Sequence, residues 1–254
     1  MRSFITIMLR SWTVMKKTLF MVMLVIPLYA QGDIYAVFVG ISEYEEPGNN
    51  LTYCHRDAIE MYEMLKVHTT HNKILLLINE QAKHNNIVYY TKQLFQRAQP
   101  DDIVIFYFSG HGSRNVFFTY NKALTFSTLK SIFKQCKAKR KFIFADACFA
   151  GALRQTGNQT APVNSNIGNN VLLFLSARSD QYARENSLLG NGIFTYFLLA
   201  GLKGGADIND DHVITARELF DFVHPKVKEK TNGDQVPVMW GHFDENMIIL
   251  KVNK

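Results

Sequence analysis

The sequence of 254 residues contains only three cysteines, Cys54, Cys136 and Cys148. Small secreted scaffolds pair their cysteines in even sets, so this count excludes a framework in which every cysteine is disulfide-bonded. At least one thiol is therefore left for packing or for chemistry. Cys54 and Cys136 fall in segments with helical spacing, and we expect both to be packing residues.

Several other patterns are also missing. The sequence has no HExxH motif or other histidine ligand spacing, which argues against a catalytic zinc site. The net charge of +6 is scattered, and the only dense basic run, KAKRK at 137–141, has no interleaved aromatic residues. Nothing therefore indicates a nucleic-acid partner. Neither an internal repeat nor a charged or proline-rich linker divides the chain, which favours one domain after the N-terminal segment.

The first thirty residues differ in kind from the rest. MKKTLFMVMLVIPLYA (15–30) places two lysines before an apolar stretch and ends on a small residue. This layout is typical of a secretory signal, and about ten apolar residues are too few to span a bilayer comfortably. We expect residues 1–30 to be a signal peptide, with Met15 as an alternative start and an uncleaved membrane anchor as the competing interpretation. The protein is then exported to the periplasm or the extracellular space, without stable membrane insertion once the signal is removed.

Apolar strands and amphipathic helices alternate along residues 31–254. We expect strands at 33–41, 73–79, 102–110, 141–146, 170–177 and 246–250, and helices at 54–68, 85–98, 125–138, 192–202 and 215–227. Such alternation predicts an α/β fold, a three-layer α/β/α sandwich around a mostly parallel sheet of about six strands.

Two of the expected strands end in residues that carry chemistry. The third strand leads into SGHG (109–112), and the fourth leads into DAC (146–148). Functional groups of parallel sheets gather where the strands end. A cysteine nucleophile needs a nearby base, which His111 can supply, and the flanking glycines can expose an N–H to a developing oxyanion. The stretch around Cys148 alone also fits a packed core thiol, but His111 at the neighbouring strand end favours a nucleophile.

These motifs belong to a longer ordered set. The sequence carries YAVFVGISEY, NLTYCHRDA, DDIVIFYFSGHGS, KFIFADACFAG, LSARSDQYARE and GNGIFTYFLLAGL, in this order. With them the chain resembles the caspase-like cysteine peptidases, closest to their bacterial metacaspase-type branch. The resemblance implies a caspase-like fold, His111 as general base and acid, and Cys148 as nucleophile. It also implies an oxyanion hole formed by the backbone N–H groups of Gly112 and Cys148, peptide or protein substrates, and no cofactor required for the chemistry.

Three carboxylates are candidates for the substrate pocket. The resemblance places Asp146 in a pocket wall and matches Asp57 to an aspartate of the metacaspase pattern, and Asp180 is the third candidate. Converging carboxylates favour a cationic side chain, so we expect cleavage after Arg or Lys. Alternatively, Asp57 caps or salt-bridges its helix and Asp180 is a turn residue, and Arg56 and Arg184 would suit an acidic side chain.

Two further interpretations of the whole chain stay open. A catalytically silent relative would bind or scaffold a partner, and a cysteine hydrolase acting on non-peptide esters or amides would use the same mechanism. The presence of both His111 and Cys148 favours a peptidase. Relatives are often processed in the stretch that corresponds to 154–170, so a pocket for Arg would allow self-cleavage after Arg154.

The segment ADINDDHVITARELF (206–220) fits two patterns. An EF-hand-like calcium loop has its ligands at positions 1, 3, 5, 7, 9 and 12, which here are Asp207, Asn209, Asp211, the Val213 carbonyl, Thr215 and Glu218. His212 stands where such a loop normally has glycine. Alternatively, Thr215 and Glu218 form a capping box at the start of a helix. We expect a weakened calcium-type loop, with Ca²⁺ as the one possible cofactor.

Overall fold

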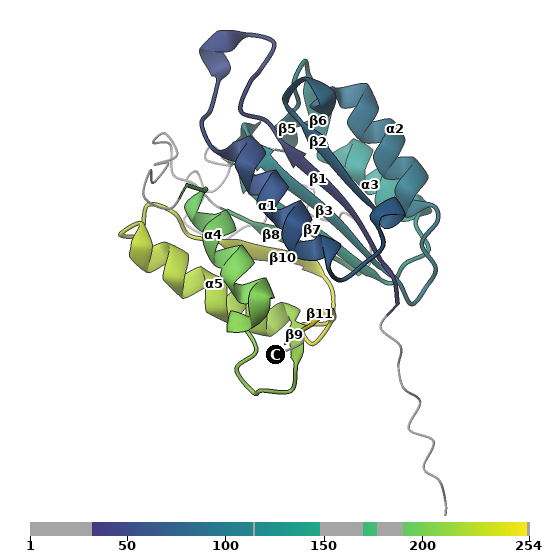
Figure 1. Ribbon diagram of the computed structural model, residues 1–254, viewed down its shortest axis with the longest axis vertical. Coiled ribbons are helices and arrows are strands. Elements are labelled where there is room, and N and C mark those ends of the chain that lie inside the picture. Colours follow the sequence, from purple (N-terminus) through teal and green to yellow (C-terminus); the bar gives the residue numbers. More distant parts are fainter. Residues whose placement is uncertain (1–31, 114, 148–169, 177–189, 253–254) are drawn as a thin grey trace, which may run out of the picture. The chain divides into compact units, whose positions relative to one another are not determined.

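Runs of β-branched and aromatic residues form a six-stranded sheet in the computed structural model, which describes residues 32–113, 115–147, 170–176 and 190–252. The sheet has the strand order β10-β8-β7-β3-β1-β2, and every neighbouring pair is parallel except β8 and β10 (Figure 1). Its strands are β1 (Ile34–Gly40), β2 (Ile74–Ile78), β3 (Ile103–Gly110), β7 (Arg140–Ala147), β8 (Val171–Leu175) and β10 (Val238–His242). The predicted α/β fold with a mostly parallel sheet is confirmed.

Five helices in the described part of the chain cover the two faces of this sheet. They are α1 (Cys54–Lys66), α2 (His84–Phe95), α3 (Phe126–Gln135), α4 (Ile193–Ala200) and α5 (Ala216–Lys230). Side chains of α1, α4 and α5 pack on one face, and side chains of α2 and α3 pack on the other, which gives the expected three layers. Shorter helical segments are η1 (Pro47–Asn49), η2 (His71–Lys73), η3 (Asn79–Ala82) and the π-helical turn η4 (Gly201–Gly205).

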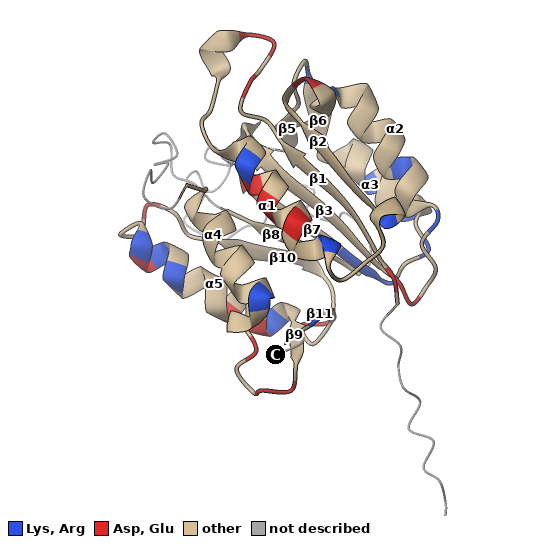
Figure 2. Ribbon diagram, viewed as in Figure 1, with Lys and Arg blue, Asp and Glu red and all other residues tan. Residues whose placement is uncertain are grey.

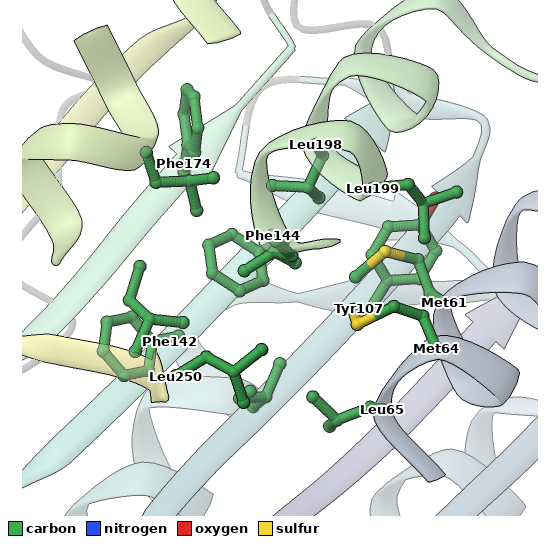
Figure 3. Packing of buried hydrophobic residues seen from close by; sticks show 14 of the residues in the cluster. Met61, Met64, Leu65, Tyr107, Phe142, Phe144, Phe174, Leu198, Leu199 and Leu250 are labelled. Carbon is green, nitrogen blue, oxygen red and sulfur yellow. The ribbon is translucent and has the colours of Figure 1, made fainter. Parts of the chain in front are cut away.

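Residues of α1 at helical spacing contribute to the first of the two core layers. Ala58, Met61 and Leu65 of α1 are buried, and Tyr62 packs at the edge of the same cluster. Figure 3 shows α1 and α4 side chains meeting the aromatic residues of the sheet, among them Met61, Met64, Leu65, Leu198, Leu199, Tyr107, Phe142, Phe144 and Phe174. Charged residues lie mostly on helices and loops (Figure 2). The alternation of the strands thus assigns one set of side chains to each face of the sheet.

Two small sheets and one strand differ from the expectation. The antiparallel strands β4 (Gly112–Ser113), β5 (Val116–Phe118) and β6 (Ala123–Thr125) follow β3 directly, and none was predicted. The expected strand at 246–250 is β11 (Ile248–Lys251), which pairs with β9 (Val213–Thr215) outside the main sheet. The sixth strand of the main sheet is β10, which lies at an edge and reads weakly because it is short and contains Gly241.

Residues from Gln31 to Lys254 group into one compact unit. The segment expected to be a signal peptide, 1–30, lies outside the described residues. Within the described ranges, each helix is too short or too polar to cross a membrane.

Candidate active site

The candidate catalytic histidine lies at the carboxyl edge of the sheet, beside the end of the neighbouring strand. His111 directly follows β3, and the register pairs Gly110 with Ala147, the last residue of β7. Cys148 is the next residue in the chain and lies outside the described residues. The structure therefore positions the predicted base and the residue that precedes the predicted nucleophile.

The imidazole of His111 contacts the loop that joins β1 to α1. Its Nε2 atom lies 2.8 Å from the backbone carbonyl oxygen of Asn49, and its ring packs against Tyr44 with centroids 5.1 Å apart. A carbonyl oxygen only accepts hydrogen bonds, so Nε2 carries the proton in this contact. In the neutral imidazole the lone pair then lies on Nδ1, which is the atom that can take a proton from a thiol.

The backbone of His111 is held by the same loop. Its N–H donates to the hydroxyl oxygen of Tyr44 at 2.8 Å, and the N–H of Tyr44 donates to Oδ1 of Asn50 at 2.9 Å. A Cβ on Gly110 would lie 2.8 Å from the Tyr44 hydroxyl oxygen, so glycine allows this approach. Sequence patterns reveal neither contact, because one acceptor is a backbone atom and the other lies 67 residues from His111 in the chain.

Two of the three predicted pocket carboxylates come together beneath α1 and α4. Asp57, in the first turn of α1, accepts hydrogen bonds from the hydroxyl of Ser109 at 2.8 Å and from the N–H of Gly192 at 2.9 Å. Asp146, on β7, accepts from the N–H and the hydroxyl of Thr195 at 3.2 and 3.0 Å. Both carboxylates are almost completely buried, with exposed fractions of 1% and 0%.

Gly192 separates these two carboxylates. A Cβ at this position would overlap Oδ2 of Asp146 and would lie 3.1 Å from Oδ2 of Asp57. The two acidic side chains therefore converge on one point, which only a residue without a side chain can occupy. Asp180, the third candidate, lies outside the described residues, as do Arg154 and Arg184.

The two carboxylates also affect the pKa of the buried phenol of Tyr107. Burial raises its pKa well above the ordinary value, and the charges of Asp57 and Asp146 raise that pKa further. Its hydroxyl lies 2.6 Å from the hydroxyl oxygen of Thr195, which in turn donates to Asp146. Tyr107, Thr195 and Ser109 were not predicted as site residues. The sequence signal for Ser109 is its place in SGHG at the end of β3, and in the structure it pairs directly with Asp146.

In the loop at 207–218, side-chain carboxylates accept hydrogen bonds from backbone N–H groups of the same loop. Asp207 accepts from the N–H groups of Asp211 and His212, and Asp211 accepts from the N–H of Val213. His212 has a φ of 64°, as the position of the usual glycine requires.

The capping box is present at the end of this loop. Glu218 accepts from both the N–H and the hydroxyl of Thr215, which is the N-cap of α5, and the Thr215 hydroxyl oxygen accepts from the N–H of Glu218. Among the described residues, no three His, Cys, Asp or Glu side chains are close enough together to hold a metal ion. The calcium loop, with Asn209 as a further ligand, stays a prediction, and binding at Glu218 would compete with the helix cap.

The two cysteines expected to be packing residues are buried. Cys54 begins α1 and Cys136 follows α3, with exposed fractions of 5% and 6%. Burial also raises the pKa of the Cys136 thiol, which makes it a poor nucleophile.

Comparison with known proteins gives a consistent result for the fold. The family model of the caspase domain matches residues 34–248. Caspase-1 from Spodoptera frugiperda superimposes with a TM-score of 0.66 at 15% identity, covering 87% of this chain and 91% of its own. The protein GSU0716 from Geobacter sulfurreducens superimposes with a TM-score of 0.63 at 16% identity, covering 86% and 97%. No curated protein sequence matches the chain significantly.

Proposed function

Because the chain belongs to the caspase domain family of cysteine peptidases, we propose that it is an endopeptidase that uses Cys148 and His111 and cleaves after Arg or Lys. The family accounts for a peptidase and for protein substrates in general. The choice of residues and the specificity rest on the geometry of the strand ends. The observation that carries the proposal is that the carboxylates of Asp57 and Asp146 converge at Gly192. Asp146 lies near the end of β7, the strand that pairs with β3, and His111 directly follows β3.

The proposed reaction has two stages. Nδ1 of His111 takes the thiol proton, and the Cys148 thiolate attacks the peptide carbonyl, so that an S–C bond forms and the carbonyl oxygen becomes an oxyanion. The N–H groups of Gly112 and Cys148 are the expected donors to this oxyanion. His111 then returns the proton to the leaving nitrogen as the C–N bond breaks. In the second stage His111 activates water, which hydrolyses the thioester and releases the free thiol.

The specificity follows from charge in a buried site. A guanidinium or ammonium group that enters beside Asp57 and Asp146 would meet two carboxylates whose hydrogen bonds to α4 fix their orientation. Electrostatic attraction is strong where water is excluded, and a guanidinium can bind carboxylates in a bidentate manner. An acidic side chain in the same place would be repelled.

The proposed function also includes export of the protein and its processing by self-cleavage. The basic and apolar layout of residues 1–30 supports export to the periplasm or the extracellular space. A pocket for Arg would permit self-cleavage after Arg154, and Ca²⁺ at the 207–218 loop would act on stability or activation rather than on the chemistry.

The test is hydrolysis of fluorogenic peptides that end in Arg, Lys or Asp by the purified chain, with and without calcium, beside Cys148→Ala and Cys136→Ala. Cleavage after Arg or Lys that disappears in Cys148→Ala and persists in Cys136→Ala is the expected result. Cleavage only after Asp would overturn the specificity and keep the nucleophile. A folded protein that cleaves nothing, with or without calcium and after limited proteolysis, would point to a binding or scaffold role.

A further inference from the structure

A cavity of about 460 Å³ opens on the side of His111 that faces the β1–α1 loop. One wall is formed by this loop and the other by the turn between β5 and β6, and His111 and Gly112 also line the cavity. The lining residues that matter to its chemistry are Glu45, Glu46, Phe118, Tyr120 and Lys122. A cavity of this size lies within the range of ligand sites in proteins.

Hydrogen bonds join the two walls and tie them to the histidine. The N–H of Glu45 donates to the carbonyl of Tyr120 at 3.2 Å, and the N–H of Phe118 donates to the carbonyl of His111 at 2.9 Å. The ammonium group of Lys83 lies over the ring of Tyr120, 5.7 Å from its centroid, which helps to hold that ring. The cavity is therefore preformed, and its position relative to His111 is fixed.

This cavity and the carboxylate pair lie on opposite faces of the sheet. Asp57 belongs to α1, and Gly192 and Thr195, which bind the carboxylates, begin α4; both helices pack on the first face. The β5–β6 turn belongs to the second face, where Phe117 packs with α3. A substrate that passes His111 can thus place one side chain against the carboxylates and the next in the cavity.

Chemistry assigns the cavity to the leaving half of the substrate. In the proposed function, on which this inference rests, His111 delivers its proton to the nitrogen of the residue after the cleaved bond. The side chain of that residue therefore emerges next to His111. Among the described residues, this cavity has His111 and Gly112 in its lining and neither Asp57 nor Asp146, so we assign it to that side chain.

The lining favours an aromatic occupant. Phe118 keeps 40% of its surface exposed although it borders a cavity, so it offers an uncovered ring. Glu45 and Glu46 line one wall and Lys122 lines the other, and Lys83 also lies near enough to interact with Glu45, so charges of both signs are present around the cavity. We propose that this cavity binds an aromatic side chain at the position directly after the cleaved bond. The ring would stack on Phe118, and the charged rim would give no strong preference for either sign.

The experiment compares five internally quenched peptides that carry Arg before the cleaved bond and differ only in the next residue, which is Phe, Tyr, Ala, Lys or Glu. The full chain, Phe118→Ala, Phe118→Leu and Tyr90→Ala are assayed for kcat/KM, and the ratio of Phe to Ala is taken within each enzyme. Tyr90 is the matched control, because it is an aromatic residue of α2 with 45% exposure outside the cavity. Burying a phenyl ring that is otherwise exposed corresponds to about a 10- to 100-fold preference.

The expected result is a Phe to Ala ratio of about tenfold or more in the full chain and in Tyr90→Ala. The ratio should fall toward one in Phe118→Ala and remain partly in Phe118→Leu, which keeps an apolar side chain. Equal rates for the five peptides, or a preference for Lys or Glu, would overturn this inference while leaving the proposed function intact. Failure to cleave any arginyl substrate, including a fluorogenic one that lacks the leaving residue, would overturn both.

Discussion

Gly192 offers a direct test of the carboxylate pair through a single added methyl group. Its backbone has φ −60° and ψ 139°, which alanine adopts without strain. Any effect of Gly192→Ala must therefore come from the overlap of the new Cβ with Oδ2 of Asp146 and its approach to Asp57. Relieving the overlap requires a shift of Oδ2 of Asp146, the atom that accepts both hydrogen bonds from Thr195, so these bonds are disturbed.

The cost can be estimated from those contacts. Losing one hydrogen bond to a buried carboxylate costs about 1.5–3 kcal/mol, and overpacking a filled site costs about 1–3 kcal/mol. We expect Gly192→Ala to lose about 3 kcal/mol or more of unfolding free energy. At about 2–4 °C per kcal/mol for a chain of this size, Tm should fall by at least about 6 °C. Cleavage after Arg should fall with it, since the acidic site is displaced.

Gly48→Ala is the matched control, because a Cβ at Gly48 meets no atom within 4 Å. Thermal unfolding followed by circular dichroism, and hydrolysis of an arginyl peptide, should separate the two variants. If Gly192→Ala unfolds within about 2 °C of Gly48→Ala and cleaves arginyl peptides normally, the carboxylates do not converge at Gly192 as described, and the proposed basis of specificity is wrong.

Three further predictions concern other contacts. Tyr44→Phe removes the acceptor of the His111 N–H and keeps the ring contact. An unsatisfied donor costs about 1–3 kcal/mol, so kcat/KM should fall about 5- to 160-fold; unchanged steady-state kinetics would contradict this positioning role. Glu218→Ala breaks the capping box with Thr215 and should lower unfolding free energy by about 1 kcal/mol, whereas Glu218→Gln should retain most of it in calcium-free urea titrations; equal losses would contradict the cap. The pKa of Tyr107 is raised on folding, so its contribution to stability is present below its unfolded pKa of about 10 and is lost as pH rises above it. Urea titrations from about pH 8 to 11 should therefore show a steeper alkaline loss in the parent than in Tyr107→Phe, and parallel curves would refute the shift.

The layers of the fold could be predicted because their signals are local and strong. Continuous apolar runs such as 34–40 and 103–110 are buried on both faces, so the run itself indicates a buried strand. The sequence does not predict β10, because an edge strand has fewer buried positions, and it favours 246–250 as the sixth strand because the apolar run there is stronger. The strands β5 and β6 are three residues each, too short to show an alternation in the sequence, although Phe117 and Leu124 at their centres are fully buried.

In the candidate site, the sequence indicates the main residues but not the contacts that orient them. His111 and Asp146 could be found because each lies within one residue of a strand end, and Asp57 because it belongs to a matched motif. The contacts that orient these residues join segments 49 to 135 residues apart, as between Asp57 and Gly192 or Asp146 and Thr195. Such pairs depend on helix placement over the sheet, which no single stretch of sequence encodes.

The carbonyl of Asn49 has a consequence for genetics. The position of a backbone acceptor depends on the path of the loop and not on the identity of residue 49. Replacing the Asn49 side chain therefore leaves the contact with Nε2 of His111 available. A mutational scan would score position 49 as tolerant. Single-residue insertions and deletions between Tyr44 and Asn50, which change the path of the loop, are the changes to which the histidine is sensitive.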